Sequence, residues 1–200
     1  MTHLRLATAS PAEQRDAFLT IVAECLTLMR TLRLARDLDL PDWWIVSGAL
    51  YQQVWNALAG RPEMASVKDI DLFYFDPDTS WNAEDAVIAR VARTFPPHPP
   101  VEVRNQARVP LWYESRFGHP YPPLCSSAEA IDRFASRTHA VGVRLRSDGG
   151  FDLHAPYGLS DIFAFRLAPN PLLPHRATHE SKAARQKAIW PELEIVPWPA

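Results

Sequence analysis

The chain has 200 residues, 47% of them hydrophobic and 22% charged, which is enough for one core and about one domain. A formal net charge of −2 does not indicate the general basic field that draws proteins to nucleic acid or anionic membranes. No stretch approaches the roughly 18 apolar residues of a membrane span. Cys25 and Cys125 fit reduced thiols. We therefore expect a cytoplasmic protein with no membrane partner.

The N-terminal part reads as helix, then strand, then helix. Ser10-Pro11-Ala12-Glu13 is a capping box, and apolar residues follow it at helical spacing, which predicts one long helix over 11–36. The apolar run 43–46 is typical of a buried strand and ends at Ser47-Gly48. A helix is predicted over 49–58.

The remaining segments alternate between the two types of element. Strands are predicted over 68–75 and from 101 onward, with a helix over 82–94 between them. Residues 138–146 and 151–153 form a hairpin around the turn 147–150. Short helices follow Gly158 and span 180–188. This order predicts an α+β (α/β-like) fold with a small mixed central sheet flanked by helices.

Proline clusters mark loops within this fold. The chain has 19 prolines, about twice the average share of roughly 5%. Neither side of a cluster has enough chain for a second core. We predict a single domain over 1–200, with an N-terminal helix in 1–40, a core in 41–165 and a C-terminal extension in 166–200.

Asp69-Ile70-Asp71 is the motif that points to chemistry. In a strand, side chains two residues apart share a face, so Asp69 and Asp71 would stand side by side. Two neighbouring carboxylates repel unless a cation neutralises them or one takes up a proton. The pair therefore predicts a site for Mg²⁺ or Mn²⁺, which prefer oxygen ligands.

The order of these motifs resembles the DNA polymerase β-like nucleotidyltransferases, in which a Gly/Ser turn after one strand precedes an Asp-x-Asp on the next. The chain is also similar to a family of small bacterial nucleotidyltransferase-like proteins from about residue 43 onward. The blocks that carry this second resemblance are Ser47-Gly48-Ala49-Leu50, Val54-Trp55, Lys68-Asp69-Ile70-Asp71-Leu72, Val103-Arg104-Asn105-Gln106-Ala107-Arg108, Leu111-Trp112-Tyr113 and Ala155-Pro156-Tyr157-Gly158-Leu159-Ser160-Asp161-Ile162-Phe163. The family commonly has a His shortly after Arg108, where this chain has Val109-Pro110.

The resemblance implies transfer of a nucleoside monophosphate from an NTP with release of pyrophosphate, which uses two cations. Two acids do not comfortably hold both, and Glu102, within the apolar run 101–103, is the first candidate for a third. It occupies the position where the superfamily keeps its third acid. Asp152, in Phe151-Asp152-Leu153, is the alternative, and a site with two acids only is the remaining one.

Several other residues are candidates for nucleotide binding. Gly48 would allow a sharp turn, so that amides at the start of the next helix receive phosphate oxygens, and the Ser47 hydroxyl would contact phosphate. Lys68 precedes the acidic pair. Arg108 could bind phosphate in a bidentate manner, and Asn105 could orient a ribose or base.

Aromatic and basic residues outside these motifs are assigned structural roles. Trp112 and Tyr113 are read as core side chains in preference to base-stacking ones. Lys182, Arg185 and Lys187 are read as a solvated helix face in preference to a nucleic-acid contact.

Three functions remain open from the sequence. The first is a metal-dependent nucleotidyltransferase with an unknown acceptor, in which Asp69, Asp71 and Glu102 hold the metal. The second is a nucleotide-binding or partner-binding module without catalysis. The third is a metal-dependent phosphohydrolase that uses the same carboxylates.

Overall fold

A five-stranded mixed sheet forms the centre of the computed structural model, which describes residues 2–199. Its strands follow the order β3-β2-β1-β4-β5. Only β2 and β3 are parallel neighbours in it. The strands are β1 (Trp44–Val46), β2 (Ile70–Tyr74), β3 (Val101–Asn105), β4 (Gly142–Leu145) and β5 (Phe151–His154), and β4 with β5 is the predicted hairpin.

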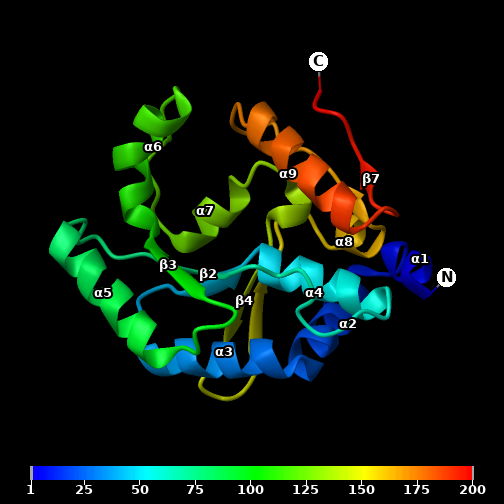
Figure 1. The fold of residues 1–200 in the computed structure, drawn as a ribbon, viewed down its shortest axis with the longest axis horizontal. Coiled ribbons are helices and arrows are strands. Elements are labelled where there is room, and N and C mark those ends of the chain that lie inside the picture. Colours follow the sequence, from blue (N-terminus) through cyan, green and yellow to red (C-terminus); the bar gives the residue numbers. More distant parts are fainter. Residues whose placement is uncertain (1, 200) are drawn as a thin grey trace.

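Helices surround this sheet (Figure 1). They are α1 (Thr2–Ala7), α2 (Pro11–Glu24), α3 (Leu26–Leu38), α4 (Gly48–Leu58), α5 (Trp81–Thr94), α6 (Val109–Phe117), α7 (Ser127–Asp132), α8 (Ser160–Phe163) and α9 (Arg176–Ile189), with short 3₁₀ turns η1 (Gln106–Arg108) and η2 (Arg137–His139). In Figure 1, α6 and α9 stand at the upper left and upper right with α7 between them, and α2 and α3 run along the bottom. A small parallel pair, β6 (Arg166–Leu167) and β7 (Glu194–Ile195), joins the ends of the C-terminal segment.

The main core joins the C-terminal segment to the rest of the chain. Trp55 and Trp190 are fully buried, and their rings meet edge to face at 5.2 Å. The Trp55 indole N–H donates a 2.8 Å hydrogen bond to the carbonyl of Ile162. Burial of side chains this large contributes on the order of 2–3 kcal/mol each, so Trp190 anchors the C-terminal segment in the fold.

The segment expected as one helix over 11–36 is two helices. Cys25 separates α2 from α3 with an extended backbone at φ −76° and ψ 107°. The carboxylate of Glu63 accepts hydrogen bonds from the backbone amides of Leu26 and Thr27, at 3.2 Å and 2.7 Å. These are amides that the start of α3 leaves without a helical partner, and a carboxylate satisfies them well. The Cys25 sulfur accepts a further hydrogen bond from the Leu28 amide, at 3.4 Å. The start of α3 is therefore capped both by Cys25 and by a residue distant in sequence.

The sequence did not lead us to expect the helices α1, α6 and α7, the 3₁₀ turns or the strands β6 and β7. Among the helices within residues 2–199, none has the length and hydropathy needed to cross a membrane.

Candidate functional site

The predicted acids lie at one edge of the sheet, on two neighbouring parallel strands. Asp71 on β2 is in register with Glu102 on β3, and Asp69 lies one residue before β2 begins. On β2 the buried residues Ile70, Leu72 and Tyr74 alternate with less buried ones. Asp69 and Asp71 therefore share the face that does not enter the core, as strand geometry requires.

Asp71 is the acid of this group whose negative charge is disfavoured by burial. Burial raises the pKa of its carboxyl to about 6, and the negative charge of Asp69 acts in the same direction. Lys182 lowers the pKa, and Glu102 raises it further. An anion that is disfavoured by burial and by its neighbours gains most from a cation placed beside it.

The chemistry of these donors fits Mg²⁺ or Mn²⁺, because all three are carboxylates and the central one is destabilised without a counter-ion. Among residues 2–199, no three His, Cys, Asp or Glu side chains are grouped so that they could hold a metal ion. Glu102 is exposed and Asp69 half-buried, so both have room to turn toward a cation.

Asp152, the alternative third acid, lies elsewhere. It belongs to β5 at the opposite end of the sheet order from β3. Arg144 and Arg146 bind its carboxylate at 2.8 Å and 3.1 Å. Burial acts to raise the pKa of Asp152, but the hydrogen bonds from these arginines outweigh it and lower the pKa. Asp152 is thus already neutralised by protein groups, whereas Glu102 lies directly beside Asp71.

The turn between β1 and α4 lies next to the acids, since Val46 pairs with Asp71. Its sharp bend is made by Ser47, at φ 56° and ψ −115°, and not by Gly48 as expected. A non-glycine residue in this region costs on the order of 1–3 kcal/mol, and such strain is concentrated at functional sites. Gly48 instead begins α4, where a Cβ would meet the Gln52 side-chain nitrogen at 3.1 Å.

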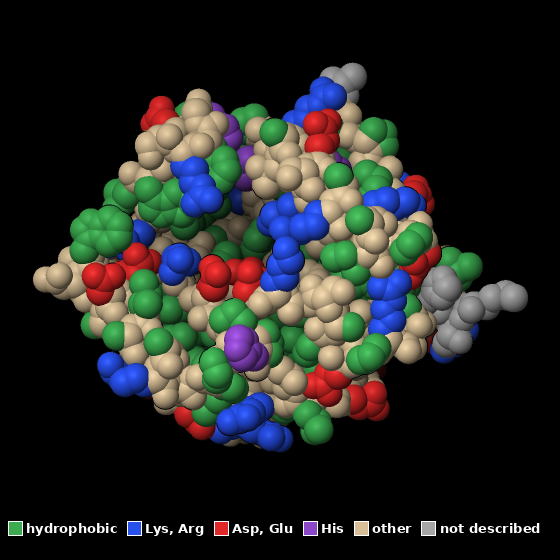
Figure 2. Space-filling model, viewed as in Figure 1, with side chains coloured by type: hydrophobic (Ala, Val, Ile, Leu, Met, Phe, Trp, Pro, Cys, Tyr) green, Lys and Arg blue, Asp and Glu red, His purple; other side chains and the backbone are tan. Residues whose placement is uncertain are grey.

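Lys182 and Arg185 on α9 are charged residues near this edge that the sequence analysis assigned to a solvated face. Burial lowers the pKa of Lys182, while the carboxylates of Asp71 and Asp69 favour its charged form. The charge of Arg185 acts on Lys182 and on Tyr51, which lies in the first turn of α4. Lys68 is exposed. Figure 2 shows a hollow on this face, with acidic side chains on its lower rim and basic ones beside them at the right.

The one sequence signal that could have pointed to this pair is the spacing of Lys182 and Arg185. Residues three apart on a helix share a face, so the two cations had to lie together. The periodicity alone does not say what that face meets.

Asn105 is hydrogen-bonded to the loop after β2. The residue is 1% exposed. Its side-chain oxygen accepts from the amides of Asp76 and Ala107, at 3.0 Å and 3.1 Å, and its nitrogen donates to the carbonyls of Asp76 and Asp78. All of these groups belong to the protein, so Asn105 holds the loop in place, and its contact with a nucleotide stays a prediction.

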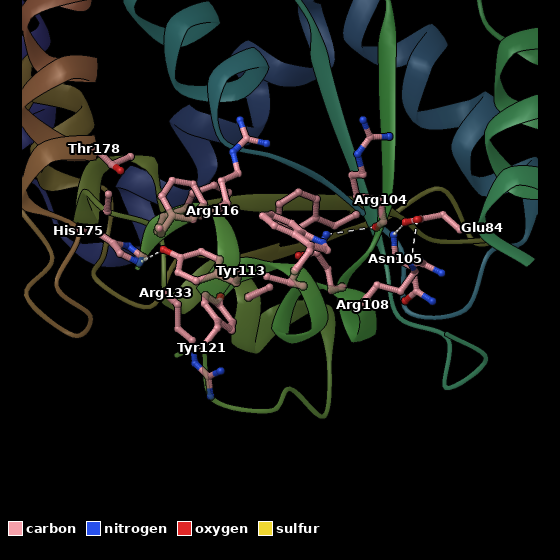
Figure 3. A pocket seen from close by; sticks show the side chains of 18 of the residues that line it. Glu84, Arg104, Asn105, Arg108, Tyr113, Arg116, Tyr121, Arg133, His175 and Thr178 are labelled. Atoms are coloured by element: carbon pink, nitrogen blue, oxygen red, sulfur yellow. Dashed lines mark hydrogen bonds and ion pairs between the residues drawn. The ribbon is translucent and has the colours of Figure 1, made fainter. Parts of the chain in front are cut away.

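Arg108 is engaged in the same way. Its Nε lies 2.9 Å from Glu84, it donates to the carbonyl of Thr79, and its guanidinium lies 4.1 Å from the Trp81 ring centre. Figure 3 shows Arg108, Glu84 and Asn105 together on one wall of a cavity, with Tyr113 and His175 hydrogen-bonded on the other. Arg108, which was predicted to bind phosphate, is therefore already paired with the buried carboxylate of Glu84.

A family model described as nucleotidyltransferase matches residues 33–195. A solved structure described as "The NMR structure of the protein reveals a CCA-adding enzyme head domain" is 26% identical, with a TM-score of 0.74 over 96% of this chain and 100% of that one. A search of curated proteins gave no match. The structural likeness confirms the expected fold class.

Proposed function

The chain belongs to the nucleotidyltransferase family, and from that premise we propose that it transfers a nucleoside monophosphate from an NTP to an acceptor, with release of pyrophosphate and with Mg²⁺ or Mn²⁺ as cofactor. The observation that carries the proposal is the register of Asp71 with Glu102. Asp69 lies two residues before Asp71, and the charge of Lys182 acts on both aspartates. The repelling carboxylates suit a bound metal cation, and the nearby lysine suits the negative charge of a phosphate. A metal–nucleotide complex supplies both charges.

The carboxylates of Asp69, Asp71 and Glu102 would hold the metal, whose charge would stabilise the developing negative charge at the reacting phosphate. Ser47 and the start of α4 would receive phosphate oxygens, because first-turn amides and the helix dipole favour anions there. Lys182 and Arg185, with the exposed Lys68, would neutralise the remaining phosphate charge. Asn105 and Arg108 would keep the adjoining loop in place.

Nucleotide binding and turnover of the purified protein test this assignment together. Each of the four NTPs is titrated with and without Mg²⁺, and pyrophosphate and free phosphate are measured. We expect metal-dependent NTP binding and pyrophosphate release. Asp71→Asn and Glu102→Gln should each lower the rate of pyrophosphate release at least roughly a hundredfold. Asp152→Asn is the matched control, because it removes an acid from the same sheet away from the site.

Each product pattern selects one function. Pyrophosphate release that survives in Asp71→Asn would remove that residue from the site. Saturable NTP binding without either product would favour the non-catalytic module. Free phosphate without pyrophosphate would favour a phosphohydrolase that uses the same acids.

A further inference from the structure

A cavity of about 610 Å³ opens next to the acidic edge of the sheet, and its size is that of a small-molecule site. Its walls come from β2, β3, η1, α5, α6, α7, α9 and the segments before and after α7. α6 and α7 were not anticipated from the sequence, so the cavity could not be either. Figure 3 shows it from close by, with charged and aromatic side chains on facing walls.

One wall is a connected aromatic cluster. The Tyr113 ring packs against the rings of Phe117 and Tyr121, with centres 4.5 Å and 4.6 Å apart. Trp112 is 38% exposed and Phe117 is 41% exposed, although both line the cavity. Tyr113 is thus buried as expected, whereas Trp112 offers open ring surface. Large rings left exposed around a concavity are typical of a ligand site.

The cavity is also strongly basic in a chain whose net charge is −2. Its lining contains one acid, Glu84, which is paired with Arg108. Its cations are Arg104, Arg108, Arg116, Arg133 and Lys182. In the described part of the chain, residues 2–199, Arg104 and Arg116 make no ion pair with a carboxylate, so their charges are available to a ligand.

The cavity adjoins the proposed metal site without including it. Arg104 lies two residues beyond Glu102 on β3, and Phe73 lies two residues beyond Asp71 on β2, so each shares a face with an acid. Both line the cavity, but the acids and Ser47 do not. A molecule in the cavity would reach the acidic edge from the side while the triphosphate occupied the edge itself.

We propose that this cavity is the acceptor site, and that the acceptor is a planar ring carrying one anionic group, a phosphate or a carboxylate, and a free hydroxyl. The proposal rests on the proposed function. The ring would stack on Trp112 and the cluster around Tyr113, and Arg116 would bind the anion. The hydroxyl oxygen would then be held close to the α-phosphorus, the geometry that a two-substrate transfer requires.

The proposed transfer forms one bond to the α-phosphorus and breaks another. The hydroxyl oxygen forms a bond to the α-phosphorus, and the bond from that phosphorus to the oxygen bridging to the β-phosphate breaks. Pyrophosphate leaves with that electron pair. The hydroxyl proton passes to a carboxylate of the acidic edge.

Binding of a fluorescent planar anion tests the cavity without requiring turnover. 8-Anilinonaphthalene-1-sulfonate is the probe, and N-phenyl-1-naphthylamine, which lacks the sulfonate, is its neutral counterpart. We expect Arg116→Gln to weaken binding of the anion roughly fivefold to tenfold and to leave the neutral dye unchanged. Trp112→Leu should weaken both dyes, and Arg93→Gln, an exposed arginine of α5 outside the cavity, should weaken neither.

Competition then separates an acceptor site from a donor site. The anion is titrated in the presence of Mg²⁺ and saturating α,β-methylene analogues of the four NTPs. Simultaneous binding supports an acceptor site, and displacement of the anion by adenosine monophosphate or by 4-hydroxybenzoate under these conditions identifies a phosphate or a carboxylate.

Two results would overturn the proposal. Displacement of the dye by the NTP analogues would make the cavity the nucleobase pocket of the donor. Unchanged dye binding in Arg116→Gln and Trp112→Leu would show that these two residues do not form a binding site for a planar anion. A failure of the proposed function would be a different result. No pyrophosphate would be released, but the dye would still bind in the cavity.

Discussion

At Asp71 the proposed metal-binding role and the stability of the fold oppose each other. Its carboxyl has a pKa of about 6 because it is buried and has acidic neighbours. Between about pH 4 and about pH 6 the folded protein therefore holds a proton that the unfolded chain has lost. The free energy of unfolding of the metal-free protein should fall as pH rises through this interval and should then stay low. Without a cation, the ionised site is a destabilised one.

Asp71→Asn should remove this penalty. At neutral pH, with a chelator present, we expect the free energy of unfolding to rise by up to about 2 kcal/mol, because the amide carries no charge to bury. At pH about 4 the variant and the parent should be equally stable. Denaturant unfolding at the two pH values measures both quantities.

Asp152→Asn is again the control, with the opposite sign. Hydrogen bonds to arginines lower the pKa of Asp152, so its charged form stabilises the fold at neutral pH and its replacement should be destabilising. Identical pH profiles for the parent and Asp71→Asn would show that Asp71 is not the strained acid.

Arg108 is the residue for which sequence and structure suggest different tasks. A guanidinium suits phosphate, but here it is buried and paired with Glu84. We expect Arg108→Gln to lower the free energy of unfolding by about 3 kcal/mol, because Glu84 would be left buried without its partner. Adding Glu84→Gln should recover part of this loss, as a double-mutant cycle would measure.

Nucleotide titration of the folded fraction at low temperature separates the two tasks. An NTP affinity within roughly threefold of the parent is the result for a structural arginine. Unchanged stability together with much weaker NTP binding would restore Arg108 as a phosphate ligand.

At the scale of elements, local patterns predicted what local physics decides. Strand alternation correctly placed Asp71 on the less buried face of β2, with Asp69 just before the strand, and the capping box at Ser10 correctly began α2. The bend after β1 was expected at Gly48 but occurs at Ser47, because the surrounding fold imposes a backbone that no propensity favours. The apolar spacing through Cys25 is continuous, so nothing local marks the break between α2 and α3.

Glu63 helps to cap the start of α3 at that break, and its replacement should show this contribution. We expect Glu63→Gln to destabilise the protein by about 1 kcal/mol at neutral pH, since the charge at the N-terminus of α3 is lost. Burial acts to raise the pKa of Glu63, but hydrogen bonds from Thr27 and Leu26 outweigh it and lower the pKa. The stabilisation is therefore present above the ordinary carboxyl pKa and is lost as pH falls below it.

Unfolding measured from neutral to acidic pH should show the parent approaching the variant as the carboxylate is protonated. Glu24→Gln, at the end of α2, is the matched control and should change little. A constant difference across the whole pH range would mean that the charge of Glu63 is not what stabilises α3.

At the scale of the whole molecule, the site is assembled from segments far apart in the chain. The acidic edge and the turn after β1 lie in the part of the sequence where the motifs are dense, and they could be anticipated. Lys182 lies in the segment predicted as a C-terminal extension, but Trp190 anchors that segment in the main core beside Trp55. Only this packing brings α9 near Asp71, and no periodicity within α9 encodes it.

Lys182 therefore tests whether α9 contributes to nucleotide binding or only covers the core. We expect Lys182→Gln to weaken binding of every NTP roughly tenfold, since one charge-assisted contact to phosphate is lost, whichever base is present. Burial lowers the pKa of Lys182, so its charge is held at a cost and its removal should leave the free energy of unfolding unchanged or higher. Arg176→Gln is the control, because this exposed arginine of α9 pairs only with Glu180 among residues 2–199. Calorimetric titration with Mg²⁺ measures the affinities. Equal NTP affinity in Lys182→Gln and the parent would confine phosphate binding to the β1–α4 turn and the acidic edge, and α9 would then serve the fold alone.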